Sequence, residues 1–234
     1  MGSQALKTES TSELSRSAVR GAALLIIATG IAACGDSDSD ARGGGEPVAD
    51  PVEGVHGTSP AAVGGIPTVV SLTPVTGGGS TPTEGVEARV ADEGVIDQFG
   101  LAFSPARLLV ATGATMTFTN SESALTHNVH LRWIDGDSTI FNGDASTGEA
   151  IRVRLPMEGG YDVLCDMHPG MTAFVYATSA PYAVFASDDG TFHIGYVPPG
   201  EYTVGLWSAD IGAQPAGTVI VGTGATEVRL PPAG

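Results

Sequence analysis

The sequence predicts an all-β protein, because turn-forming residues are abundant and the apolar residues come in short runs. The chain of 234 residues contains 33 glycines and 15 prolines, which favours many turns and few long helices. From about residue 62 onward, short runs rich in threonine, valine and aromatic residues alternate with Gly, Pro, Asn, Asp and Ser. This pattern is typical of an antiparallel β-sandwich and not of alternating βαβ units.

The N-terminal part of the chain has the organisation of an export signal. Lys7, Arg16 and Arg20 come first, and residues 21–33 (GAALLIIATGIAA) follow without a charged residue. This stretch is too short for a membrane span of about 20 residues, but it suits the apolar part of a signal peptide. We therefore predict a signal peptide over residues 1–33.

The residues before Cys34 indicate how the signal ends. The junction Ile31-Ala32-Ala33-Cys34 resembles the lipobox of bacterial lipoproteins, in which the cysteine is acylated and becomes the new N-terminus. The alternative is an ordinary signal peptide cleaved near the alanine pair, which would leave a free thiol in an oxidising compartment. The resemblance implies lipidation of Cys34 and export to the periplasmic or cell-surface side of a bacterial membrane, where the lipid anchors the protein.

Residues 34–60 are expected to form a flexible acidic tether. The stretch is acidic, rich in Gly and Pro and almost without large apolar residues. Such a segment cannot bury enough apolar surface to offset the conformational entropy that it would lose on ordering. Asp36, Asp38 and Asp40 alternate with serine, but the segment lacks the glycine and distal glutamate of a calcium loop. A solvated acidic run is therefore the preferred interpretation.

Two groups of short strands follow the tether. Residues 61–179 are predicted to form a β-sandwich, and residues 180–234 a second, small β-sandwich-like section. The strands expected in the first group are 68–72, 107–111, 115–119, 128–133, 150–155, 161–165 and 173–177. Those expected in the second group, which SDDG and VPPGE turns connect, are 182–186, 191–194, 202–206 and 218–221.

The stretch CDMHPGM at residues 165–171 holds a thiol, an imidazole and two thioethers in a chain with two Cys, five His and five Met. With Cys34 lipidated, Cys165 has no partner for an internal disulfide, and a free thiol in an exported protein needs a reason. One cysteine and two histidines with a weak axial methionine form the ligand set of blue copper centres. A buried structural thiol is the alternative explanation for Cys165.

A blue copper site needs a second histidine from elsewhere in the chain. The stretch LTHNVHL offers His127 and His130, which lie three residues apart. On an extended strand these two side chains face opposite sides, so only one of them can point into a sandwich. The spacing alone leaves the choice between them open.

The segment from FSPARLLVATGATMTFTNSESALTHNV to YDVLCDMHPGM resembles the plastocyanin and amicyanin branch of the cupredoxins, over about residues 62–178. The shared landmarks are an F-x-P before a strand, Gly113, the F-x-N at 118–120, the His-Asn-Val at 127–129 and the Cys-x-x-His-x-x-Met. The resemblance implies a Greek-key β-sandwich with one type-1 copper ion per chain. The residues that it implies as copper ligands are His127, Cys165, His168 and Met171.

The resemblance also implies a role for residues around the ligands. Asn128 matches an asparagine that ties the two ligand-bearing loops together and helps to hold the thiolate. His130 matches no ligand, and we expect it to be an ordinary surface residue on the opposite face of its strand.

The last part of the chain, PYAVFASDDGTFHIGYVPPGEYTVGLW, resembles carboxypeptidase regulatory-like β-domains. The D-G-x-F turn at 189–192 and the V-P-P-G-x-Y turn at 197–202 carry this resemblance. It implies a β-domain over residues 180–234 but indicates no substrate, since a fold and a domain order do not determine a function.

The cupredoxin resemblance implies single-electron transfer between redox partners outside the cytoplasm, and no enzymatic activity. Copper oxidases and nitrite reductases need further histidines for a second copper site, whereas this chain has five His and no His-x-His pair. The balance of 10 basic to 26 acidic residues disfavours nucleic acid and favours a redox protein with a basic docking surface. The competing function is a non-redox binding or copper-delivery module on the same frame.

Overall fold

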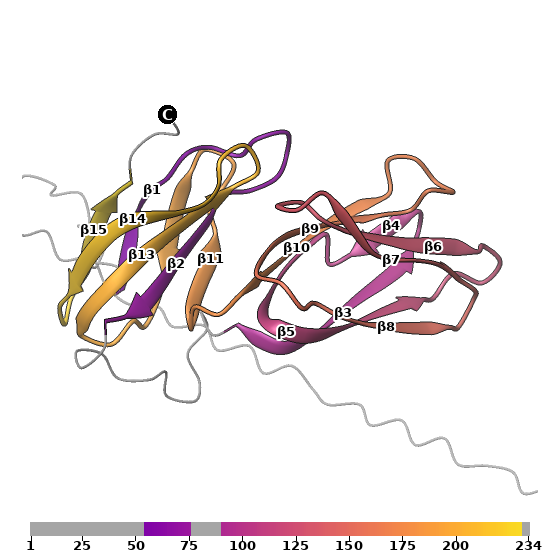
Figure 1. Cartoon of the computed structure of the whole chain (residues 1–234), viewed down its shortest axis with the longest axis horizontal. Coiled ribbons are helices and arrows are strands. Elements are labelled where there is room, and N and C mark those ends of the chain that lie inside the picture. Colours follow the sequence, from indigo (N-terminus) through magenta and orange to yellow (C-terminus); the bar gives the residue numbers. More distant parts are fainter. Residues whose placement is uncertain (1–53, 76–89, 231–234) are drawn as a thin grey trace, which may run out of the picture. The chain divides into compact units, whose positions relative to one another are not determined.

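The computed structural model describes residues 54–75 and 90–230, whose strands form two β-sandwiches (Figure 1). All regular secondary structure in these residues is β-strand, which confirms the predicted all-β fold class. Within these ranges, no helix is long and apolar enough to cross a membrane. The predicted signal peptide, Cys34 and most of the predicted tether lie outside the described residues.

The central sandwich comprises residues 90–178, and its eight strands belong to one hydrogen-bonded network. The hydrogen-bonded order is β4-β3-β5-β10-β9-β6-β7, and β8 pairs with β5. The strands are β3 (Ala91–Phe99), β4 (Ala102–Ser104), β5 (Arg107–Asn120), β6 (His127–Trp133), β7 (Ser138–Ala145), β8 (Ala150–Arg154), β9 (Gly159–Leu164) and β10 (Thr172–Thr178).

Strand β5 connects the two layers of the central sandwich. Residues 107–111 pair in parallel with β10, whereas residues 115–119 pair with β8 and, in parallel, with β3. Gly113 lies between the two parts with a φ of +85°, a conformation that glycine adopts without the steric cost of a side chain. The two strands predicted at 107–111 and 115–119 are therefore halves of one strand, which changes partners at Gly113.

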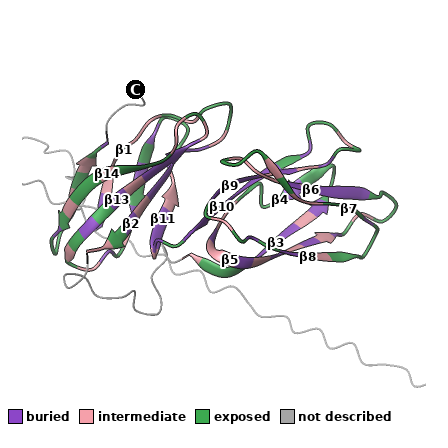
Figure 2. Cartoon of the chain, in the orientation of Figure 1, coloured by how far each residue is buried: buried purple, intermediate pink, exposed green. Residues whose placement is uncertain are grey.

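Alternate residues of these strands build the core of the central sandwich (Figure 2). On β5, Val110, Ala114, Met116 and Phe118 are buried, while the residues between them are more exposed, because successive side chains of a strand point to opposite faces. These residues belong to one apolar cluster with Val129, Leu131, Tyr161, Val163 and Val175. The cluster holds β6 and β9 together, and the predicted metal ligands lie at the ends of these two strands.

The terminal sandwich comprises two sheets, with strand orders β12-β1-β15 and β11-β2-β13-β14. Its strands come from both sides of the central sandwich in the sequence. They are β1 (Val55–Thr58), β2 (Val69–Pro74), β11 (Tyr182–Phe185), β12 (Thr191–Ile194), β13 (Gly200–Ser208), β14 (Gly212–Val221) and β15 (Thr226–Arg229).

The boundaries predicted for the tether and the two domains differ from this arrangement. Strand β1 lies within the predicted tether, and it pairs with β12 and β15. Strand β2 lies within the predicted first sandwich, and it pairs with β11 and β13. The physical reason is burial: Val70 and Leu72 are fully buried in one apolar cluster with Tyr182 and Tyr202. The terminal sandwich is thus discontinuous in sequence, and the central sandwich is inserted between β2 and β11.

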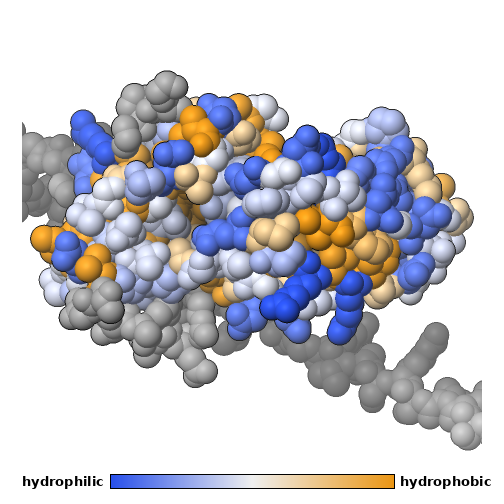
Figure 3. Space-filling model, in the orientation of Figure 1, coloured by the Kyte–Doolittle hydropathy of each residue, from blue (hydrophilic) through white to orange (hydrophobic). Residues whose placement is uncertain are grey.

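The described residues, 54–75 and 90–230, belong to one compact unit, and aromatic side chains on β10 and β13 pack together within it. Trp207 on β13 is buried and stacks on Phe174 of β10, with 5.4 Å between the ring centroids. Its Nε1 donates a hydrogen bond of 2.8 Å to Asp135 Oδ1. On the face drawn in Figure 3, hydrophilic residues surround an apolar area on the central sandwich.

Candidate metal centre

Three candidate metal ligands lie together at one end of the central sandwich. His127 is the first residue of β6, and Cys165 and His168 lie in the loop between β9 and β10. The donor atoms of the three side chains all lie within 4.8 Å of one another. The two imidazole Nδ1 atoms are 3.0 Å apart, and Cys165 Sγ lies 3.5 Å from His168 Nδ1 and 3.9 Å from His127 Nδ1.

The loop that carries Cys165 and His168 is held in a tight turn by its own main chain. The His168 N–H donates to Cys165 O, the Met171 N–H to His168 O, and the Cys165 N–H to Met171 O, at 3.1 to 3.3 Å. Gly170 supplies a φ of +95°, which a residue with a Cβ rarely adopts. These bonds bring Met171 back to Cys165, and the side chains of both residues are buried.

Burial also determines the charge state of the histidine on β6. His127 is fully buried, and this burial, together with the neighbouring His168, holds its pKa below the usual value. The imidazole is therefore neutral at neutral pH and keeps a lone pair for a metal ion. Its Nδ1 faces His168 and Cys165, while its Nε2 is buried without a hydrogen-bond partner among the described residues.

The donor chemistry fits copper. A thiol and two imidazoles form the trigonal set of a type-1 site, and a thioether is its usual weak axial ligand. Met171 is buried in the same apolar cluster as Cys165. In the part of the chain that the structure describes, no other group of at least three His, Cys, Asp or Glu side chains is arranged to hold a metal ion.

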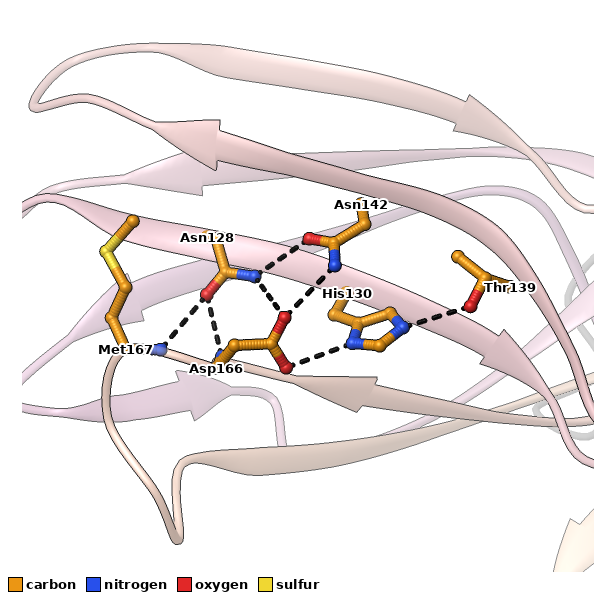
Figure 4. A network of polar contacts seen from close by, with 6 residues as sticks. All are labelled: Asn128, His130, Thr139, Asn142, Asp166 and Met167. Carbon is orange, nitrogen blue, oxygen red and sulfur yellow. Dashed lines mark hydrogen bonds and ion pairs between the residues drawn. The ribbon is translucent and has the colours of Figure 1, made fainter.

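Asn128 connects strand β6 to the ligand loop (Figure 4). Its Oδ1 accepts hydrogen bonds from the main-chain N–H groups of Asp166, at 2.7 Å, and Met167, at 3.3 Å. Its Nδ2 donates to Asn142 Oδ1 at 3.0 Å and to Asp166 Oδ2 at 3.1 Å. The side chain after His127 thus fixes the main chain after Cys165, so that two ligand-bearing segments far apart in sequence are joined directly.

His130 lies apart from the three donor atoms. Its Nδ1 is 3.0 Å from Asp166 Oδ1, and its Nε2 is 3.1 Å from Thr139 Oγ1 (Figure 4). The structure therefore brings His127, and not His130, to Cys165 and His168. The sequence analysis expected His130 to be an ordinary surface residue, but its ring is partly buried and contacts the ligand loop.

Asp166, Asn142 and Thr139 are the contacts that the sequence analysis did not identify. Hydrogen bonds from His130 and then Asn142 to the carboxylate hold the pKa of Asp166 below its ordinary value, so this residue is ionised at neutral pH. An aspartate next to a candidate ligand was the only signal in the sequence, and its partners lie 24 to 38 residues away.

Comparison with known proteins supports this description of the site. Residues 90–177 match the family model of copper-binding proteins of the plastocyanin/azurin family. A comparison with curated protein sequences found no match.

Three of the similar solved structures are a purple cupredoxin, an auracyanin and an amicyanin. A purple cupredoxin from Nitrosopumilus maritimus is 28% identical over 37% of this chain and 99% of its own, with a TM-score of 0.32. The reduced auracyanin from Roseiflexus castenholzii is 20% identical over 38% of this chain and 98% of its own, with a TM-score of 0.33. The amicyanin from Paracoccus versutus is 22% identical over 41% of this chain and 95% of its own, with a TM-score of 0.33.

The family match spans β5, β6 and the loop with Cys165 and His168, which are the segments that form the candidate centre. The central sandwich, over residues 90–177, is therefore similar to copper-binding proteins of the plastocyanin/azurin family, and its donor side chains fit copper as the cofactor.

Proposed function

We propose that this protein is a carrier of single electrons, with one type-1 copper ion bound by His127, Cys165, His168 and Met171. The observation that carries the proposal is the approach of two imidazole Nδ1 atoms and one thiol to within 4.8 Å of one another. Copper supplies the one-electron couple in such a site. The four side chains hold the metal and occupy its ligand positions, so no position is left for a substrate, and we propose no enzymatic activity for this chain alone.

The burial of the site favours electron transfer over copper delivery. His127, Cys165 and Met171 are at most 4% exposed, so water and competing ligands have little access to them. A delivery protein must hand its metal to another protein, which an exposed methionine- or histidine-rich site does more readily. Buried ligands on a rigid sandwich favour a carrier, because the site then rearranges little when the metal changes its oxidation state.

The surface around His168 is suited to brief docking of a redox partner. His168 is partly exposed, and four large apolar side chains at the same end of the sandwich are between 40% and 62% exposed: Phe99, Leu101, Leu125 and Met167. The turn between β3 and β4 is held beside the segment before His127, because the Gly100 N–H donates to Glu122 Oε1 and the Ser121 N–H to Gln98 O. We propose that this apolar surface and the His168 edge form the electron port.

The net charge of the chain and its N-terminal residues suggest the kind of redox partner and the place where the protein acts. A formal net charge of −16 would attract a redox partner with a basic docking surface, at a rate that falls with ionic strength. Lipidation of Cys34 would hold the protein on the outer side of a bacterial membrane. We further propose that residues 180–234 form a β-domain of the carboxypeptidase regulatory-like kind. Strands β1 and β2 belong to the same sandwich.

Visible absorption on titration with Cu(II) tests the proposed ligands. We would use the full chain in detergent with Cys34→Ser, which leaves Cys165 as the one cysteine. We expect an intense blue or violet thiolate-to-copper band in this protein and in His130→Gln, and its loss in Cys165→Ser and His127→Gln. His130→Gln is the matched control, since it is the same substitution three residues away. A band that survives in Cys165→Ser, or no band in the parent protein, would contradict the proposal.

A further inference from the structure

The carboxylate of Asp166 connects the ligand loop to two strands of the central sandwich. Asp166 directly follows Cys165. Its Oδ2 accepts hydrogen bonds from Asn128 Nδ2 on β6, at 3.1 Å, and from Asn142 Nδ2 on β7, at 3.0 Å. Its Oδ1 lies 3.0 Å from His130 Nδ1. Both oxygens of one side chain are thus held from neighbouring strands (Figure 4).

The partners of Asp166 are themselves fixed. His130 Nε2 lies 3.1 Å from Thr139 Oγ1 on β7, so both nitrogens of its ring have partners. Asn128 Nδ2 donates to Asn142 Oδ1 at 3.0 Å, which links the two amides to each other. Strands β6 and β7 pair along their length, with His130 opposite Asn142. The side chains that bind the carboxylate are therefore held in place by the pairing of β6 with β7 and by their own hydrogen bonds.

The alternation of side chains along the strand explains why this network touches the metal site without entering it. His127 points inward and is buried, while His130, three residues along β6, lies on the other face and is partly exposed. In the loop, Cys165 is buried and Asp166 is exposed. His130 and Asp166 thus pair on the outer face of the sandwich, while His127 and Cys165 lie on the inner face. Asp166 is one residue from Cys165, and His130 is three residues from His127.

The negative charge of the Asp166 carboxylate affects the reduction potential of a copper ion bound at Cys165. The carboxylate adds a fixed negative charge next to the thiolate residue, and oxidised copper carries one more positive charge than reduced copper. The oxidised state therefore gains more from the carboxylate, which lowers the reduction potential of the site. Because the carboxylate has partners at both oxygens, its movement relative to β6 and β7 is restricted.

We propose that Asp166 is a positioning residue of the copper site: it fixes the ligand loop against β6 and β7 and lowers the reduction potential of copper, while His130 and Asn142 hold its carboxylate in place. The proposal rests on the proposed electron-transfer function for its second part. Its first part concerns the chain alone and applies equally to the metal-free protein.

The test compares Asp166→Asn with Asp144→Asn in the full chain. Asp144 is an exposed aspartate on β7, opposite Asn128 in the strand register, so its substitution removes the same charge at the same end of the sandwich. We expect the midpoint potential of copper-loaded Asp166→Asn to rise clearly above that of Asp144→Asn, and its charge-transfer band to shift. His130→Gln, which keeps the charge of Asp166 but loosens the carboxylate, should shift both readouts in the same direction and by less.

Hydrogen exchange provides the readout that needs no metal. In metal-free Asp166→Asn, the main-chain N–H groups of residues 166–168, 170 and 171 should exchange several-fold faster than in Asp144→Asn or the parent protein, because an amide offers one acceptor oxygen and no charge and can no longer make all the contacts of the carboxylate to His130, Asn128 and Asn142. Asp166→Glu serves as the conservative variant if Asp166→Asn does not fold, and we expect it to restore part of the protection. Equal potentials and equal exchange in the two asparagine variants would overturn the inference. A parent protein that never forms the charge-transfer band would instead contradict the proposed function, and hydrogen exchange would still decide whether Asp166 positions the loop.

Discussion

Substitution of Asn120 by alanine should destabilise the central sandwich by about 3 kcal/mol. Asn120 is the last residue of β5 and is only 1% exposed. Its Nδ2 donates to Leu125 O at 2.9 Å and to Ala145 O at 2.8 Å, and its Oδ1 accepts from the Glu122 N–H at 3.0 Å. One buried amide thus organises the segment that leads from β5 to His127.

The magnitude follows from these three hydrogen bonds. Each contributes about 1 kcal/mol net to stability, and a buried group left without a partner costs about 1 to 3 kcal/mol. Asn120→Ala removes all three bonds and leaves two carbonyl groups without their donors, so the loss lies between about 2 and 4 kcal/mol. The last of these carbonyls belongs to Ala145, which pairs with His127, so the metal site should be loosened as well.

Urea denaturation of the metal-free protein measures this loss. Ser123→Ala is the control, because it truncates a polar side chain at an exposed position of the same connecting segment, where water can replace it. We expect the control to lose less than about 1 kcal/mol. An Asn120→Ala variant that is no less stable than Ser123→Ala would contradict this role of the buried amide.

Three further changes test other parts of the account by the same denaturation measurement. Trp207→Phe keeps most of the buried ring but removes the N–H bond to the Asp135 carboxylate, so it should cost about 1.5 to 3 kcal/mol; an unchanged stability would mean that this bond contributes nothing. Gly170→Ala should cost about 1 to 2 kcal/mol, because its φ of +95° is unfavourable for a side chain although the space around it is open; a smaller cost would show that the loop relaxes. Burial raises the pKa of Asp97, but hydrogen bonds from Thr119 and its neighbours outweigh burial and lower it. A carboxyl group whose pKa is lower in the folded than in the unfolded protein stabilises the fold above the unfolded pKa, and this stabilisation is lost as the pH falls. The free energy of unfolding of the parent protein should therefore exceed that of Asp97→Asn by less and less from about pH 6 to about pH 3; a constant difference would contradict this.

The sequence predicted the fold class and the short-range part of the site. Cys165, His168 and Met171 lie within one loop, so their spacing alone indicates a metal site. The choice of His127 over His130 depended on the family resemblance, and the structure places His127 beside the other two donors. Strand alternation could exclude one of the two histidines but could not say which, since it does not show which face of β6 points inward.

Two features could not be predicted because they depend on contacts between distant segments. The run VVSLTP of β2 has the apolar pattern of a strand in either sandwich, and only its pairing with β11 and β13 places it in the terminal one. The partners of Asp166 come from β6 and β7, and an aspartate in a loop is usually no more than a solvated charge. Local patterns identify strands and ligands, whereas register and strand order determine which of them meet.

Spectroelectrochemical titration of the copper-loaded full chain with Cys34→Ser tests directly whether the protein carries single electrons. We expect the thiolate-to-copper band to bleach and return reversibly with one electron per chain, and to be absent from Cys165→Ser. This result would show that Cys165 binds one redox-active copper ion. A copper-loaded protein without this band, or a band that bleaches irreversibly with release of the metal, would contradict electron transfer and favour a binding or copper-delivery protein on a cupredoxin frame.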